Sequence, residues 1–75
     1  MELREAVKQI LREMGKTQVW LSEQMGYSSS RALQNTLARG NIELNNLLRL
    51  CEKVGGRLII RYGNKEVELT RKEKQ

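Results

Sequence analysis

The segment from Ser28 to Arg39 carries the side chains of this chain that are best suited to recognise another molecule. It reads SSSRALQNTLAR and contains three serine hydroxyls, two amides and two guanidinium groups, but no acidic residue. A surface that serves only for solvation normally mixes both signs of charge. We therefore expect this segment to meet an anion.

The composition leaves little room for an enzyme or a metal site. The chain has 75 residues with no His, no Asp and a single Cys, Cys51. A Ser-His-Asp triad and a Cys/His zinc site both need residue types that are missing. We expect no catalytic residue, no metal and no cofactor. A lone thiol fits a reducing compartment, and no apolar run is long enough to span a bilayer, so we expect a cytoplasmic protein without a membrane partner.

The basic excess is unevenly distributed. The formal net charge is +5. Residues 1–27 balance four basic groups with four acidic ones, whereas residues 28–61 carry six basic groups against two acidic ones. Such an excess is compatible with nucleic acid, with an anionic surface or with solubility alone. Its position in the middle of the chain is more informative than its size.

Apolar spacings of three and four predict four short helices. They cover residues 2–14, about 18–25, the stretch from the serine triplet to Arg39, and roughly 43–54, each ending near a glycine. Thr17 and at least one of the three serines are the expected N-caps. The polar residues of the third helix lie opposite Leu33 and Leu37. The core side of the fourth helix is expected to hold Leu44, Leu47, Leu48, Cys51 and Val54.

A β-hairpin is predicted after the helices. Two β-rich runs, residues 57–62 and 65–69, flank Gly63-Asn64, a two-residue hairpin signal. Pairing across this turn sets Arg61 opposite Glu66 on one face. The other face collects Leu58, Ile60, Tyr62, Val67 and Leu69. A lone hairpin is marginal in water, so this face must cover the helices or pair with a second chain. Residues 70–75 read as a frayed tail.

These elements resemble the helix-turn-helix domains of the phage repressor and Cro type, the XRE family. The resemblance spans about residues 3–56. Its motifs are Thr17-Gln18, Leu21-x-x-x-Met25-Gly26, Leu33 and Leu37, Arg39-Gly40, and Leu47-Leu48-x-x-Cys51-x-x-Val54-Gly55. It implies a mainly α fold: a four- to five-helix, repressor-like domain over residues 1–56 with a C-terminal β-hairpin over 57–69 and a flexible tail over 70–75.

The resemblance makes the third helix a recognition helix that enters the major groove of double-stranded DNA. The expected base contacts are Ser29, Ser30, Arg31, Gln34 and Asn35, and the expected backbone contacts are Lys16, Gln18, Ser28, Arg39 and Asn41. The apolar hairpin face is the expected homodimer interface. Trp20 is left open between core, subunit interface and DNA.

The sequence thus predicts a homodimeric transcriptional regulator, most simply a repressor, on a pseudo-palindromic operator. One alternative is an antitoxin that represses its own operon and neutralises a cognate toxin. Another is a protein-interaction module that has lost DNA binding. An enzyme is the poorest option, because the remaining Glu, Lys, Tyr and Cys residues form no recognisable grouping.

Overall fold

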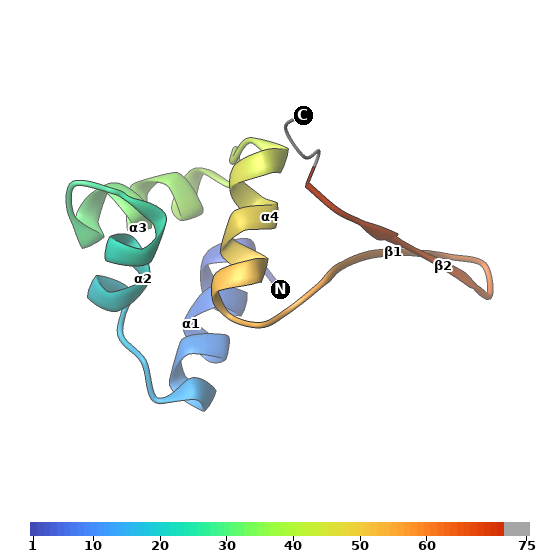
Figure 1. Cartoon of the computed structure of the whole chain (residues 1–75), viewed down its shortest axis with the longest axis horizontal. Coiled ribbons are helices and arrows are strands. Elements are labelled where there is room, and N and C mark those ends of the chain that lie inside the picture. Colours follow the sequence, from blue (N-terminus) through green and yellow to red (C-terminus); the bar gives the residue numbers. More distant parts are fainter. Residues whose placement is uncertain (72–75) are drawn as a thin grey trace. The chain divides into compact units, whose positions relative to one another are not determined.

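The computed structural model describes residues 1–71 and, within them, consists of four helices followed by an antiparallel hairpin (Figure 1). The elements are α1 (Leu3–Met14), α2 (Gln18–Met25), α3 (Ser30–Arg39), α4 (Leu44–Lys53), β1 (Leu58–Tyr62) and β2 (Lys65–Leu69). The predicted mainly helical chain with a C-terminal hairpin is therefore confirmed.

The chain forms two compact units. The first is Met1–Ile42, which holds α1 to α3, and the second begins at Glu43 and holds α4 and the hairpin. The boundary expected after residue 56 stays a prediction. Of the tail predicted over residues 70–75, residues 72–75 lie outside the described residues.

The helices of the first unit begin and end within one residue of the predicted bounds. The Thr17 hydroxyl accepts a hydrogen bond from the Trp20 backbone N–H at 3.0 Å and so caps α2. At the other end of this helix Gly26 has φ 78°, a left-handed conformation that glycine adopts without a steric penalty. This residue ends α2 and starts the turn toward α3.

Three helices supply the buried side chains of the first unit. Six apolar residues are at most 2% exposed: Val7 and Leu11 on α1, Leu21 and Met25 on α2, and Leu33 and Leu37 on α3. Each pair is four residues apart, so its members lie on one face of their helix. Both α1 and α2 pack against α3. The core thus fixes α3 from one side and leaves its opposite side exposed.

Ser22 is the buried polar residue on α2. It is 2% exposed, and its hydroxyl donates to the backbone carbonyl oxygen of Val19 at 2.7 Å. A buried hydroxyl without a partner would destabilise the fold, whereas this one is satisfied within its own helix. The small side chain is compatible with the close packing of α2 on α3.

The prediction for the core side of α4 is wrong at its first position and incomplete in its second turn. Leu44 is 52% exposed, whereas Leu50, which was not expected in the core, is 3% exposed. Leu48 is buried as expected, and Leu47, Cys51 and Val54 are half-buried. Leu44 is the first residue of the helix, where the stripe begins. Because Leu50 lies beside Leu47 and Val54 on the helix surface, the covered face is wider than a single stripe.

The hairpin has the predicted register in every pair. Leu58 lies opposite Leu69, Ile60 opposite Val67, and Tyr62 opposite Lys65 beside the turn. Gly63 has φ 58°, and no residue other than glycine has a positive φ among those described. A positive φ at the first central residue alone is the pattern of a type II′ turn, whose twist suits a two-residue hairpin.

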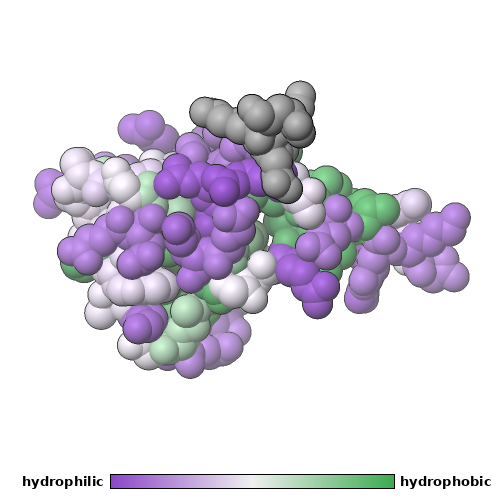
Figure 2. Space-filling model, viewed as in Figure 1, coloured by the Kyte–Doolittle hydropathy of each residue, from purple (hydrophilic) through white to green (hydrophobic). Residues whose placement is uncertain are grey.

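Apolar side chains remain exposed on the hairpin. Ile60 is 49%, Tyr62 53% and Val67 44% exposed, and Leu58 and Leu69 are half-buried. Figure 2 shows the apolar surface that these strands contribute. None of the helices in the described part of the chain has the length and apolarity required to cross a bilayer.

Candidate nucleic-acid interface

The start of α3 is set by the middle serine of the triplet. The Ser29 hydroxyl accepts a hydrogen bond from the Ala32 backbone N–H at 3.2 Å, so Ser29 is the N-cap. The first four N–H groups of an α-helix lack carbonyl partners within it, and because the Ser29 hydroxyl accepts that of Ala32, those of Ser30 and Arg31 remain without an intrahelical partner. Ser28 lies exposed just before the cap. A backbone N–H pair and nearby hydroxyls are thus placed to receive an anion.

One face of α3 presents the predicted base-reading side chains. Arg31, Gln34 and Asn35 are exposed and stand three and four residues apart, so they share a face of the helix. Ser30, at the start of the helix, is half-buried. The structure therefore places three of the five predicted base contacts on one exposed face, whereas the hydroxyl of a fourth, Ser29, caps the helix.

This face carries positive charge without a compensating acid. No Asp or Glu occurs in the sequence between Glu23 and Glu43. Among the described residues, no carboxylate forms an ion pair with Arg31 or Arg39. Both guanidinium groups are therefore available to an external anion.

The predicted backbone contacts are spread along the unit rather than gathered at one point. Arg39 and Asn41 are exposed at the C-terminal end of α3, on either side of Gly40. A helix of 10 residues is about 15 Å long, so these two lie roughly that far from the Ser29 cap. They can flank a groove but cannot act at the same phosphate as the serines.

Gln18 opens α2 and is half-buried. Its Oε1 atom is buried and accepts no hydrogen bond from any described residue. Phosphate oxygens only accept hydrogen bonds, so a phosphate contact by this side chain must use the amide Nε2 as donor. This assigns the nitrogen, not the oxygen, to the predicted backbone contact.

Lys16 lies against Trp20. Its Nζ atom is 5.3 Å from the centre of the indole ring, within the range of a cation–π contact. Trp20 is half-buried. The contact was not predicted, although the spacing of four residues between a Lys and a Trp is a signal for it. A phosphate that binds Lys16 competes with the indole ring for the same charge.

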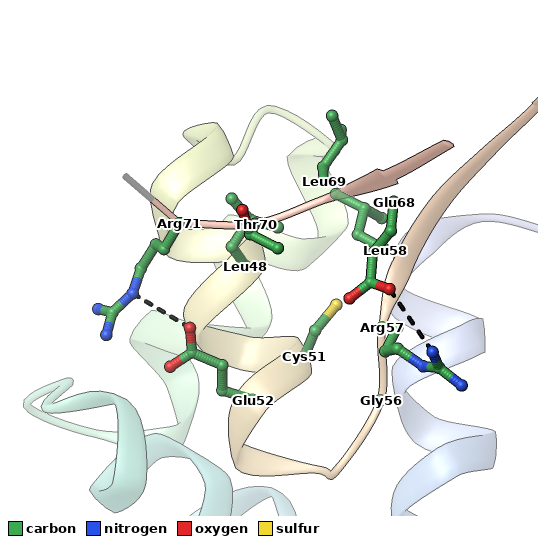
Figure 3. Close-up of a pocket in the computed structure, with 10 residues that line it drawn as sticks. All are labelled: Leu48, Cys51, Glu52, Gly56, Arg57, Leu58, Glu68, Leu69, Thr70 and Arg71. Carbon is green, nitrogen blue, oxygen red and sulfur yellow. Dashed lines mark ion pairs between the residues drawn. The ribbon is translucent and has the colours of Figure 1, made fainter. Parts of the chain in front are cut away.

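The second unit contains a small hollow between α4 and the base of the hairpin (Figure 3). Its volume is about 100 Å³, well below the several hundred Å³ that is usual for a small-molecule site. Two ion pairs border it: Glu52 with Arg71 at 3.1 Å and Arg57 with Glu68 at 3.5 Å. The hollow is thus a packing feature. The Arg57–Glu68 pair joins the two strands at the open end of the hairpin, and the Glu52–Arg71 pair joins the end of the hairpin to α4.

Cys51 lines the same hollow, with its sulfur directed toward the hairpin (Figure 3). Partial burial raises the pKa of its thiol above the ordinary value, and the nearby negative charge of Glu52 raises that pKa further. The neutral thiol is thus favoured over the nucleophilic thiolate. Within residues 1–71 no three His, Cys, Asp or Glu side chains are grouped as metal ligands.

Comparisons with protein-family models, with curated proteins and with solved structures found no match for this chain.

Proposed function

We propose that the protein binds double-stranded DNA through α3 and regulates transcription, most simply as a repressor. The observation that supports this most directly is the pairing of α2 with α3. The two helices pack together and are joined by the short turn from Gly26 to Ser29. Two packed helices joined by about three or four residues, often with a glycine, are the frame of DNA-binding helix-turn-helix units.

The exposed chemistry of α3 supports a role in reading bases. Recognition helices present their N-terminal residues to base edges in the major groove. Arg31 is suited to a bidentate contact with guanine, and Gln34 or Asn35 to one with adenine. The free N–H groups at the start of the helix are suited to a backbone phosphate.

The proposed regulator is a homodimer joined through the hairpin. Two copies of α3 about 34 Å apart meet successive turns of the major groove on a pseudo-palindromic operator. Occupying that operator is sufficient to obstruct transcription. The hairpin is the element that joins the two copies, because its apolar face is exposed and a two-stranded hairpin is marginal on its own.

A binding titration at several salt concentrations tests the proposal. The duplexes would be selected from a random pool by the wild-type protein, and affinity would be measured by fluorescence anisotropy. We expect affinity to fall steeply with salt, because neutralising phosphates releases counterions. Arg31→Ala is expected to weaken binding of the selected duplex by about 5- to 150-fold, the equivalent of about 1 to 3 kcal/mol, and to relax preference at one base position.

Two further variants separate base reading from general electrostatics. Gln18→Ala should weaken all duplexes alike, because a phosphate contact carries no sequence information. Arg4→Ala removes the same charge as Arg31→Ala from an exposed position on α1 and should have little effect. Equal losses for the two arginine variants, or no binding even at low salt, would refute the proposal; the second result favours a protein-interaction module.

A further inference from the structure

The two edges of the hairpin differ in which side chains line them. Within residues 1–71 the sheet consists of β1 and β2 alone, so each strand has one unpaired edge. A free edge offers a row of N–H and C=O groups on which another strand can form. Only one of the two edges is suited to pairing with the same edge of a second copy.

The register decides which backbone groups point outward. In a hairpin closed by a two-residue turn the flanking residues, here Tyr62 and Lys65, form a hydrogen-bonded pair, and pairs alternate from there. Ile60 and Leu58 therefore bond toward β2, whereas the backbone groups of Ile59 and Arg61 point away from it. On β2 the outward groups are those of Glu66 and Glu68.

The edge of β2 is unsuited to pairing with itself. Antiparallel pairing of two identical β2 edges must place outward residues opposite outward residues. The available registers set Glu66 against Glu66, Glu66 against Glu68, or Glu68 against Glu68 of the second copy. Like charges directly opposite one another are destabilising. Every one of these registers therefore repels.

Of the β1 registers that pair at least three residues of each strand, those centred on Ile59, Ile60 and Arg61, one is favourable. A register centred on Ile59 sets Arg57 against Arg61 of the second copy. A register centred on Arg61 sets Arg61 against its own counterpart, so both registers oppose like charges. The register centred on Ile60 sets Ile59 against Arg61 of the second copy and brings no two like charges into opposition. It also pairs Leu58 with Tyr62 of the second copy and Ile60 with its own counterpart, all on the apolar face.

We propose that two copies of this chain join through their β1 edges, antiparallel, with Ile60 on the two-fold axis. The strand order across the dimer is then β2-β1-β1-β2, and the apolar hairpin faces of both copies form one continuous surface. The proposal rests on the proposed function only in assuming that the active protein is a dimer. It names the edge and the register of that dimer.

A head-to-tail pairing of β1 with β2 of the next copy is the main competitor. It sets Arg61 opposite Glu66 of that copy, so charge alone does not exclude it. Each added copy, however, leaves another β1 edge free, and such heterologous contacts grow into open filaments. The symmetric pairing buries both β1 edges and leaves only the glutamate-lined edges outside, so it closes at two chains.

Disulfide cross-linking tests the register. The two Ile60 residues form a non-hydrogen-bonded pair, in which Cα atoms are about 4.5 Å apart, inside the range of about 4.4 to 6.8 Å that a disulfide spans. In a Cys51→Ser background, mild oxidation of Ile60→Cys should convert most of the protein into a covalent dimer. Val67→Cys, on the same face of β2, and Ile59→Cys, one residue off the axis, should cross-link much less.

Several outcomes would overturn the proposal. These are stronger cross-linking by Val67→Cys than by Ile60→Cys, a monomeric wild-type mass by sedimentation at high protein concentration, or a mass distribution extending to large polymers. The sedimentation arm needs no substitution and therefore does not depend on how a variant folds. None of these readouts involves DNA, so a monomer with Arg31-dependent DNA binding would refute this inference while leaving the proposed function intact.

Discussion

Arg31 and Arg61 are both exposed, but their surroundings give them different roles. Arg61 donates to the Glu66 carboxylate from Nε at 2.9 Å and also through its Nη2 atom. Arg31 has no ion pair with any carboxylate among residues 1–71. Surface ion pairs contribute little to stability, about 0 to 1 kcal/mol. Arg61 thus has a carboxylate partner within the hairpin, whereas Arg31 is available to a ligand.

Cys51 provides a prediction at the same scale. Its thiol has a raised pKa, first from partial burial and then from Glu52. We expect alkylation by iodoacetamide at pH 8 to be slower in the native protein than in urea, because less thiolate is present. As pH rises through the raised pKa, the fraction of thiolate in the native protein increases. The difference in alkylation rate between the native and the unfolded protein then becomes smaller.

The pH profile separates ionisation from access. A raised pKa shifts the midpoint of the native rate profile to higher pH than that of the unfolded protein. Reduced access alone lowers the native rate at every pH without moving the midpoint. Equal midpoints for the native and the unfolded protein would contradict a raised pKa of Cys51.

At the scale of elements, the sequence was sufficient for features set by local chemistry. The cap at Thr17, a cap within the serine triplet and the pairing across Gly63-Asn64 depend on residues within a few positions of each other, and all three are confirmed. The burial of Leu44 and Leu50 was predicted wrongly, because helical spacing gives the direction of the buried face but not its width or the turn at which burial begins. The exposed polar face of α3 was predictable from its spacing, whereas the Lys16–Trp20 contact was not, because a long lysine side chain just before a helix can equally extend into solvent.

The cap of α3 gives a prediction for this element. Ser29→Ala removes the acceptor for the Ala32 N–H, and loss of such a cap costs about 1 kcal/mol. We expect urea denaturation to show that loss in the free energy of unfolding, together with weaker DNA binding, because the cap positions the start of the proposed recognition helix. Ser28→Ala, one residue earlier, is the matched control and should leave stability nearly unchanged. Equal losses of stability for the two substitutions would mean that the cap does not fix α3.

At the scale of the whole molecule, the two compact units have different proposed roles, DNA contact and dimerisation. The first unit carries all of the predicted DNA contacts, from Lys16 to Asn41, and the second carries the dimerising edge. Joining two weak DNA contacts in one dimer raises affinity because the second contact becomes intramolecular. A substitution that disrupts the hairpin dimer should therefore lower the affinity for DNA, although no hairpin residue is predicted to contact the DNA.

Ile60→Glu tests this coupling. It places two glutamates together on the proposed two-fold axis, so sedimentation should show a monomer. Affinity for a duplex with two half-sites should then fall to that for a single half-site. Asn45→Glu makes the same change in charge at an exposed position on α4 and should preserve both the dimer and the affinity. If Ile60→Glu yields a monomer with undiminished affinity, the dimer does not contribute to binding.

Trp20 has a practical consequence for the DNA-binding measurements. It is the single tryptophan of the chain, and its ring lies beside the Lys16 ammonium group, a predicted phosphate contact. Intrinsic indole emission therefore comes from one position within the candidate interface. The protein carries its own fluorescent reporter there, and titrations with DNA can be followed in unlabelled wild-type protein.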